Sequence, residues 1–339
     1  MKTAAILTKW LAAMSILLLS TNSIADTQQG EIVGATKHDM PSWFKESFLD
    51  ISEDASEAGD ENKHVMLFFQ RDDCPYCERM LRESIDAEPL RSFIQEHFDV
   101  IAINTKGDRE IAFDENTIVT EKELKEKLKV KHTPNLYFLN HQNDAVARLN
   151  GYRSPARMKH LLEYVQTKSY LKTSLPDYMA EHVTKGAYKL RENDLFQPLD
   201  DLSKVKGPLA VIFEDSSCDE CDYLHDRLLM HPDIQQEIKA FTVVRLNTDS
   251  DKKITNTDGE TMTPAQWANT LKMTYRPGII MYVDGKQMEH INGTLYPYHF
   301  RETLRYIGRG MHKTMTRKEY MSARKEELLS SGENIDYSE

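Results

Sequence analysis

The sequence predicts an α/β protein with two similar domains in tandem, each built on a central mixed sheet flanked by helices. Three observations support this. The chain has 339 residues with 40% apolar composition, which is enough for roughly two hydrophobic cores. A Cys-x-x-Cys motif occurs twice, at Cys74 to Cys77 and at Cys218 to Cys221, each time after an apolar run. Short apolar runs also alternate with helical stretches in the same order in both halves.

The two halves share landmarks at a nearly constant offset. The motifs are 144 residues apart. Five further pairs are each 143 apart: Asn104 and Asn247, Thr120 and Thr263, Leu128 and Leu271, Lys129 and Lys272, Pro134 and Pro277. One inserted or deleted residue accounts for the difference, so we predict a tandem duplication.

The first copy has a clear order of elements. Residues 64–69 form an apolar, aromatic-rich run typical of a buried strand, and the cysteines then open a helical stretch. The remaining pattern predicts strands at 98–103, 135–139 and 145–149, and helices at 121–130 and from Ser154-Pro155 to about 168.

The second copy predicts strands at 208–213, 242–246, 278–283 and 286–291, with Asp284-Gly285 as a hairpin turn and a helix after Pro297. We expect a linker at 169–194, partly helical around 178–190, between domains at 40–168 and 195–310. The charged tail at 311–339 alternates basic and acidic side chains with few large apolar ones, which predicts a solvated helix that frays, or a disordered end. A docking segment is the alternative.

The N-terminus predicts export. Lys2 and Lys9 precede a short apolar stretch at 11–19, and Ser23-Ile24-Ala25 places small residues where a signal peptidase cuts, so we expect cleavage after Ala25. An uncleaved anchor is the alternative. The chain carries a net charge of −11; without the two lysines of residues 1–25 it carries −13, which makes nucleic acid an unfavourable partner.

The cysteine spacing indicates redox chemistry. Exported proteins retain disulfides, and all four cysteines fall into the two motifs. A thiol at a helix N-terminus faces unpaired amides and the positive end of the helix dipole, which stabilise the thiolate. Cys74 is therefore the predicted nucleophile and Cys77 the resolving thiol, one turn further on. Pro75 suits the first helical turn.

These residues resemble the thioredoxin fold: an apolar strand, Cys-Pro-Tyr-Cys opening a helix, then a proline before another strand, in His132-Thr133-Pro134-Asn135. The segment between Gly107 and Leu124 is similar to the corresponding segment of bacterial periplasmic thioredoxins of the SoxW type.

The resemblance implies a periplasmic thiol-disulfide oxidoreductase without a cofactor or metal. It acts on substrate proteins with disulfides or thiols, as a reductant more than an oxidant, and takes electrons from a membrane thiol-electron transporter. It implies a cis Pro134 beside the cysteines, with Thr133 offering backbone to an extended substrate. The substrate-binding residues that it implies are Pro75, Tyr76, Thr133 and Pro134, and in the second copy Arg276 and Pro277.

Two departures from the family pattern stand out. Thioredoxins carry a buried acid six residues before the first cysteine, where this chain has Phe68 and Ile212. In the second copy Asp219 and Glu220 add negative charge between the sulfurs, which should raise the pKa of Cys218 unless Arg276 offsets it. Three alternatives follow for Cys218 and Cys221: a slower second catalytic pair, a relay, or a structural disulfide.

Three other functions remain open at this stage. Four cysteines are the right number for a zinc site, although their separation is long for one. The dipeptide Pro75-Tyr76 suggests a glutaredoxin-like role. A client- or partner-binding module with structural disulfides is the third alternative, and it differs from an oxidoreductase in tolerating replacement of Cys74. The sequence does not fix the oligomeric state.

Overall fold

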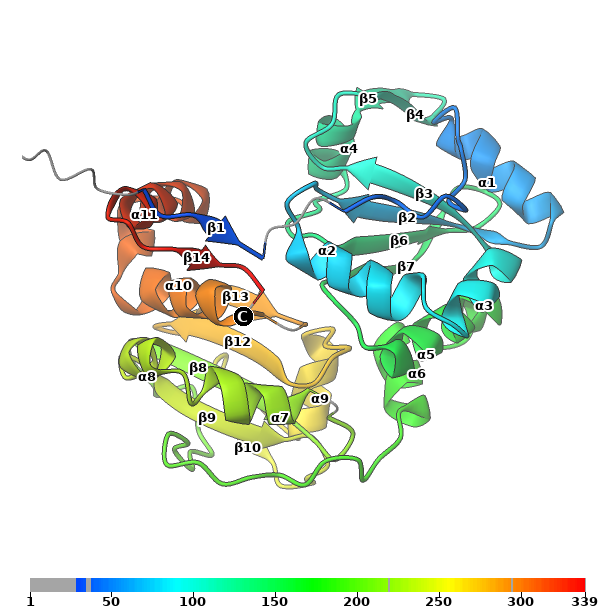
Figure 1. Ribbon diagram of the computed structural model, residues 1–339. Coiled ribbons are helices and arrows are strands. Elements are labelled where there is room, and N and C mark those ends of the chain that lie inside the picture. Colours follow the sequence, from blue (N-terminus) through cyan, green and yellow to red (C-terminus); the bar gives the residue numbers. More distant parts are fainter. Residues whose placement is uncertain (1–28, 35–37, 219, 294, 339) are drawn as a thin grey trace, which may run out of the picture.

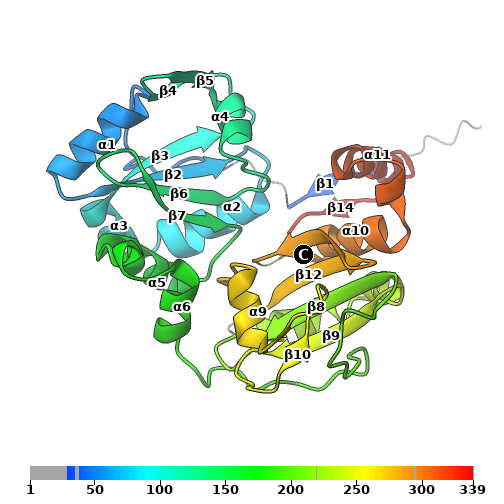
Figure 2. The ribbon, with the colours of Figure 1, turned by 180° about the vertical axis from the view of Figure 1, so that it is seen from behind.

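The computed structural model describes residues 29–34, 38–218, 220–293 and 295–338, so the predicted signal peptide lies outside the described residues. Two α/β domains lie side by side, and helices cover both faces of each sheet (Figures 1 and 2). The predicted fold class is confirmed. Within the described ranges, no helix is long and apolar enough to cross a bilayer.

Domain 1 is built on a four-stranded sheet in the order β3-β2-β6-β7, in which β2 and β3 are parallel and the other pairs antiparallel. All seven residues of β2 are buried, as its unbroken apolar sequence predicts. Its side chains alternate between two cores: Met66 and Phe68 pack toward α3 and α5, and Leu67 and Phe69 toward α1 and α4. The elements are α1 (Ile51–Asp60), β2 (His64–Gln70), α2 (Pro75–Met80), α3 (Leu90–His97), β3 (Phe98–Asn104), β4 (Glu110–Asp114), β5 (Thr117–Thr120), α4 (Glu121–Lys127), β6 (Asn135–Leu139), β7 (Ala145–Asn150) and α5 (Pro155–Gln166).

Domain 2 repeats this architecture, with a sheet in the order β9-β8-β12-β13 and the same pattern of parallel and antiparallel pairs. Asp284 and Gly285 join β12 to β13 with φ angles of 50° and 80°, the left-handed conformation that a tight hairpin turn requires. The elements are β8 (Pro208–Glu214), α7 (Cys221–Tyr223), α8 (Pro232–Ile238), β9 (Thr242–Asn247), β10 (Ile254–Thr255), β11 (Thr261–Met262), α9 (Pro264–Thr270), β12 (Gly278–Val283), β13 (Lys286–Ile291) and α10 (Pro297–Gly308).

The linker differs from the prediction. Its helix, α6, is Leu175–His182, and residues 183–192 are not helical. Thr184 and Gly186, which are poor helix formers, follow the end of α6, and Gly186 has a φ of 87°. The non-helical segment is instead held on domain 2, where the N–H groups of Gly186 and Tyr188 donate to the carbonyl of Ser216 at 2.9 and 3.1 Å.

The C-terminal tail is also ordered, so the expectation of a frayed or disordered end is wrong. It forms α11 (Arg317–Ser330) and β14 (Ile335–Asp336), and β14 pairs in parallel with β1 (Ile32–Val33). Few apolar residues are needed, because Leu328, Ile335 and Tyr337 gather around Tyr298 of α10. The tail is thus docked on domain 2, and the chain's N-terminal strand lies beside it (Figure 1).

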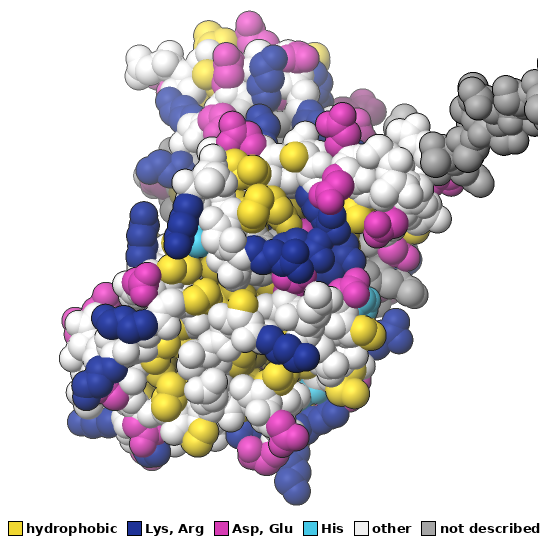
Figure 3. Space-filling view, turned by 90° about the vertical axis from the view of Figure 1, so that its left-hand side faces the viewer, with side chains coloured by type: hydrophobic (Ala, Val, Ile, Leu, Met, Phe, Trp, Pro, Cys, Tyr) yellow, Lys and Arg dark blue, Asp and Glu magenta, His cyan; other side chains and the backbone are white. Residues whose placement is uncertain are grey.

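Charged side chains on the outer side of domain 2 are largely paired with one another. Glu237 of α8, which is buried, accepts from Arg305 and Arg309 of α10 at 2.9 and 2.7 Å. Figure 3 shows both basic and acidic side chains over this face of the molecule, with a group of basic side chains near its centre.

Candidate active sites

The first site is the Cys74–Cys77 disulfide at the start of α2. Cys74 is the N-cap residue of this helix, and its Sγ accepts a hydrogen bond from the Cys77 N–H at 3.1 Å. Pro75 occupies the first turn, where its missing N–H costs nothing. The structure thus places Cys74 where the amides and the helix dipole stabilise a thiolate, as the sequence predicted.

The predicted proline loop lies beside these sulfurs. The Thr133–Pro134 peptide bond is cis, and Thr133 Oγ1 donates to Cys74 Sγ at 3.4 Å. The Arg276–Pro277 bond in domain 2 is cis as well. The structure therefore brings Thr133 and Pro134 together with the first cysteine pair, and the backbone contact from Thr133 to a substrate stays a prediction.

Tyr76, a predicted substrate contact, packs against side chains of domain 2. Its ring stacks on Tyr296 with centroids 4.5 Å apart, and its Oη accepts from the Tyr296 N–H at 2.7 Å and meets His299 Nδ1 at 3.0 Å. Burial raises the pKa of Tyr76 well above its usual value and lowers the pKa of His299 to about 3, so both side chains are neutral near pH 7. In this arrangement Cys74 is only 1% exposed.

Both cysteine motifs border the interface between the domains. Arg79 of α2, two residues after Cys77, pairs with Glu220 of the second motif at 3.3 Å. Arg157 of α5 donates to the carbonyl of Ser217, the residue before Cys218, at 2.7 Å. Domain 1 side chains therefore reach directly to the second cysteine motif.

The second site differs from the first in its position relative to the helix. The Cys218–Cys221 disulfide is formed, but α7 begins only at Cys221 and its N-cap is Glu220, so Cys218 precedes the helix. The arrangement predicted for the first copy, in which the first cysteine opens the helix, is therefore present in domain 1 and is not repeated in domain 2. Both sulfurs are covered by Tyr188 of the linker, and Cys218 is 3% exposed.

Arg276 is committed to a partner other than the sulfurs. Its Nε donates to Asp215 Oδ2 at 2.8 Å. Burial alone would raise the pKa of Asp215, but Arg276 and hydrogen bonds from Ser217 and Thr248 hold that pKa below its usual value. The positive charge that offsets the acidic residues of the second motif comes instead from Arg79, which pairs with Glu220. Asp219 lies outside the described residues.

Sequence reasoning missed a buried acid in domain 2. Glu214, the last residue of β8, is fully buried, and its Oε1 is 2.9 Å from Nε2 of His225, which is 3% exposed. The search for an acid considered only the position six residues before the first cysteine, which is Ile212. A carboxylate ending an otherwise apolar buried strand was the available signal.

The comparisons assign the class of protein. A model of the thioredoxin-like domain matches the chain twice, over residues 51–166 and 196–308. These matches take in more than half of the chain, so the protein belongs to the thioredoxin-like domain family, with two copies in tandem. Paired cysteines at a helix start beside a cis proline make it a thiol-disulfide oxidoreductase.

Solved structures with similarity to the chain each correspond to part of it. A thioredoxin-fold protein from Helicobacter pylori is 26% identical over 33% of this chain and 74% of its own, with a TM-score of 0.30. A thioredoxin from Thermus thermophilus is 23% identical over 35% and 85%, with a TM-score of 0.29. The DsbD C-terminal domain from Neisseria meningitidis, in its oxidised form, is 13% identical over 34% and 88%, with a TM-score of 0.25. No curated protein matches the sequence. Because these TM-scores are low, the assignment rests on the family match and the site geometry.

Proposed function

We propose that the protein reduces disulfides in substrate proteins through Cys74 and Cys77. Cys74 attacks a substrate disulfide and forms a mixed disulfide, and Cys77 then attacks Cys74 Sγ and releases the reduced substrate. The products are a substrate dithiol and the Cys74–Cys77 disulfide seen here.

The hydrogen bond from the Cys77 N–H to Cys74 Sγ carries this proposal. It places the first sulfur at the N-terminus of α2, where the thiolate is favoured over the thiol, and beside the cis-proline loop. In the described part of the second motif, the helix begins at Cys221, so Cys218 is not placed at a helix start in the same way.

The location and the electron source are part of the proposal. The basic and apolar N-terminal sequence supports export to the periplasm of a bacterium, with cleavage after Ala25. Reducing equivalents then come from a membrane thiol-electron transporter, because the oxidised pair must be regenerated after each turnover. Among thioredoxin-like proteins, the SoxW type remains the proposed subfamily.

Insulin reduction tests the activity. The mature chain with dithiothreitol should accelerate the turbidity of precipitating insulin B chain, and Cys74→Ser should abolish that acceleration. A wild-type chain without effect on insulin would contradict the proposal.

Burial of both cysteine pairs favours a second candidate, a partner-binding module with structural disulfides. Its partner binding would survive Cys74→Ser. The insulin assay therefore separates the two candidates.

A further inference from the structure

A buried carboxylate with an unused oxygen lies at the second disulfide. Glu214 is 0% exposed, and one of its oxygens bonds to His225. Within the described part of the chain, its other oxygen, Oε2, has no hydrogen-bond partner. A buried carboxylate oxygen without a hydrogen-bond partner is costly to the folded state, and such groups cluster at functional sites.

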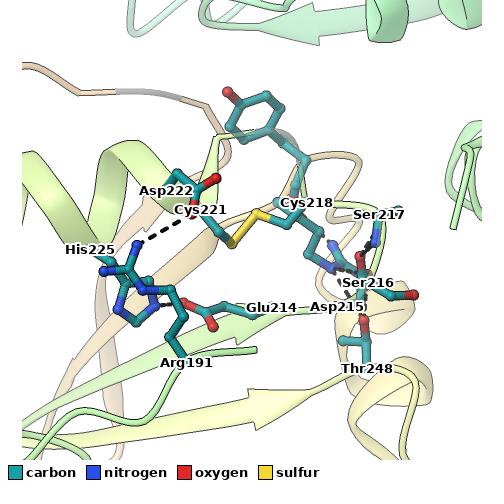
Figure 4. The surroundings of a disulfide bond; sticks show 12 residues. Arg191, Glu214, Asp215, Ser216, Ser217, Cys218, Cys221, Asp222, His225 and Thr248 are labelled. Carbon is teal, nitrogen blue, oxygen red and sulfur yellow. Dashed lines mark hydrogen bonds and ion pairs between the residues drawn. A yellow bond between two sulfur atoms is a disulfide. The ribbon is translucent and has the colours of Figure 1, made fainter. Parts of the chain in front are cut away.

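Glu214 and His225 lie at equal distances in the sequence on either side of the second cysteine motif. Glu214 ends β8 four residues before Cys218, and His225 follows Cys221 by four residues, about one turn along the same helical segment. Figure 4 shows Glu214 and His225 together on the Cys221 side of the disulfide. Cys221 is itself 0% exposed, so its proton has no direct path to solvent in this arrangement.

We propose that Glu214 and His225 are the acid–base pair that moves the proton of Cys221, which makes the second disulfide a redox centre with its own proton acceptor. The inference deepens the proposed function, because it assumes thiol-disulfide exchange as the chemistry. It does not depend on Cys74 being active.

Resolution of a mixed disulfide at the second site conserves the proton and the electrons. A mixed disulfide joins Cys218 to a client sulfur, and Cys221 gives its proton to the pair. The Cys221 thiolate then attacks Cys218 Sγ, a Cys218–Cys221 bond forms, and the client sulfur leaves as a thiolate with the electrons of the broken bond. In the reverse direction the pair returns the proton to Cys221 as it leaves.

Other charged groups near His225 are already paired. Arg191 of the linker bonds to Asp226 at 2.5 Å and to Asp222 at 3.3 Å, both on the segment that carries His225. Tyr188 of the linker has its ring centroid 6.3 Å from that of His225; burial raises its pKa to about 12, so it stays neutral. With these groups paired or neutral, Glu214 and His225 are the acid–base pair that we assign to Cys221.

Domain 1 supplies a natural comparison. With the offset of 144, the positions of Glu214 and His225 correspond to Gln70 and Leu81, which are both buried. Glutamine is therefore accommodated at the end of the equivalent strand, which makes Glu214→Gln a conservative test.

The test uses the full mature chain carrying Cys74→Ser and Cys77→Ser, so that only domain 2 reacts. The reduced protein is mixed with an aromatic disulfide, dithiobis(nitrobenzoate), in a stopped-flow instrument at pH values from 5 to 10. The first burst of nitrothiobenzoate reports attack by Cys218. The second burst reports attack by Cys221 on the mixed disulfide.

Glu214→Gln and His225→Gln should each slow the second burst at pH 7 by on the order of 10²-fold, which is typical for loss of a positioned base. The first burst should stay within about twofold, since only Cys221 depends on the pair. The deficit should shrink as the pH passes the ordinary thiol pKa of about 8.5. Asp226→Asn, which removes a neighbouring exposed charge, is the matched control and should leave both bursts nearly unchanged.

Unchanged second bursts in the glutamine variants would overturn the inference. If neither variant folds, the wild-type profile decides: an assisted Cys221 reaches its plateau well below pH 8.5, whereas an unassisted thiol keeps accelerating up to it. A wild type without a second burst would also overturn it. Insulin reduction by the chain with intact Cys74 shows separately whether the proposed function stands.

Discussion

The two domains share a scaffold and differ at the sulfurs. Both sheets have the same strand order, and both prolines before the third strand are cis. Yet Cys74 caps its helix whereas Cys218 precedes one, and Gln70 stands where domain 2 has Glu214. The comparison teaches that duplication preserves the packing that positions a site, while a few residues at strand and helix ends change its chemistry.

The side chains that cover the two disulfides differ as well. Domain 2 covers the first site through Tyr296, and the linker covers the second through Tyr188. Each site is therefore covered by a side chain from a different segment.

The largest expected effect separates the two cysteine pairs. Cys74→Ser should lower insulin reduction to the rate of dithiothreitol alone, since it removes the nucleophile. Cys218→Ser should leave that assay within about twofold, because dithiothreitol reduces the first pair directly. Turbidity measured for both variants checks the comparison.

A relay between the domains would add one signature. Cys218→Ser would slow turnover driven by the natural donor while the single-turnover reaction of Cys74 stays intact. Unchanged donor-driven turnover would exclude the relay.

The next largest effect concerns the tyrosines that cover the two disulfides. Tyr296→Ala removes a stacked aromatic pair, worth about 1 kcal/mol beyond its buried area, and should speed dithiothreitol reduction of Cys74–Cys77 about fivefold. Tyr188→Ala should speed reduction of Cys218–Cys221 only. Timed alkylation and mass spectrometry report each pair separately, and equal acceleration of both pairs by one variant would refute independent covers.

A pH effect follows from His299 at the interface. Burial lowers its pKa from the ordinary 6.5 to about 3, so the folded protein binds fewer protons there than the unfolded chain. The His299 contribution to stability is complete above about pH 6.5 and is lost progressively as the pH falls toward 3.

Urea unfolding of the oxidised protein from pH 7.5 to 4 measures this loss. His299→Gln should show a shallower decline in the free energy of unfolding than the wild type. An equal slope in the two proteins would contradict the assignment. The neutral His299 also contacts Tyr76, so acid should loosen the cover of the first site in the wild type.

The smallest effect tests the shared scaffold. Thr120 and Thr263 occupy equivalent positions and both form capping boxes, with Glu123 and Gln266 respectively. Replacing either threonine by alanine should cost its own domain about 1 kcal/mol, because one capping bond is lost. Hydrogen exchange resolves the two domains, and a markedly unequal cost would show that the local packing has diverged.

The sequence predicted the parts of the fold that follow from strong periodicity. The buried strands, the closing helices and the duplication all leave dense apolar patterns at fixed offsets, and these predictions are confirmed. The short β4–β5 and β10–β11 hairpins were missed, since strands of two to five polar-rich residues carry little pattern. The tail was misjudged because Leu328 and Ile335 are buried only through contacts with Tyr298, far away in the sequence.

The site was predicted in part for a similar reason. Cys74, Thr133 and Pro134 lie in motifs that can be recognised locally, and the structure brings them together. The pairing of Tyr76 with Tyr296 joins residues 220 positions apart, which no local pattern reveals. The partner of Arg276 likewise depends on where the loop before Cys218 folds.

The reduction potential of each cysteine pair tests the central claim most directly. The mature protein is equilibrated in dithiothreitol or glutathione buffers, alkylated, and mapped by mass spectrometry while circular dichroism monitors the fold. The account predicts reversible reduction of Cys74–Cys77 in the folded protein near the thioredoxin value of about −270 mV. A value near about −120 mV would identify an oxidant instead, and a pair that is reduced only on unfolding would contradict the account.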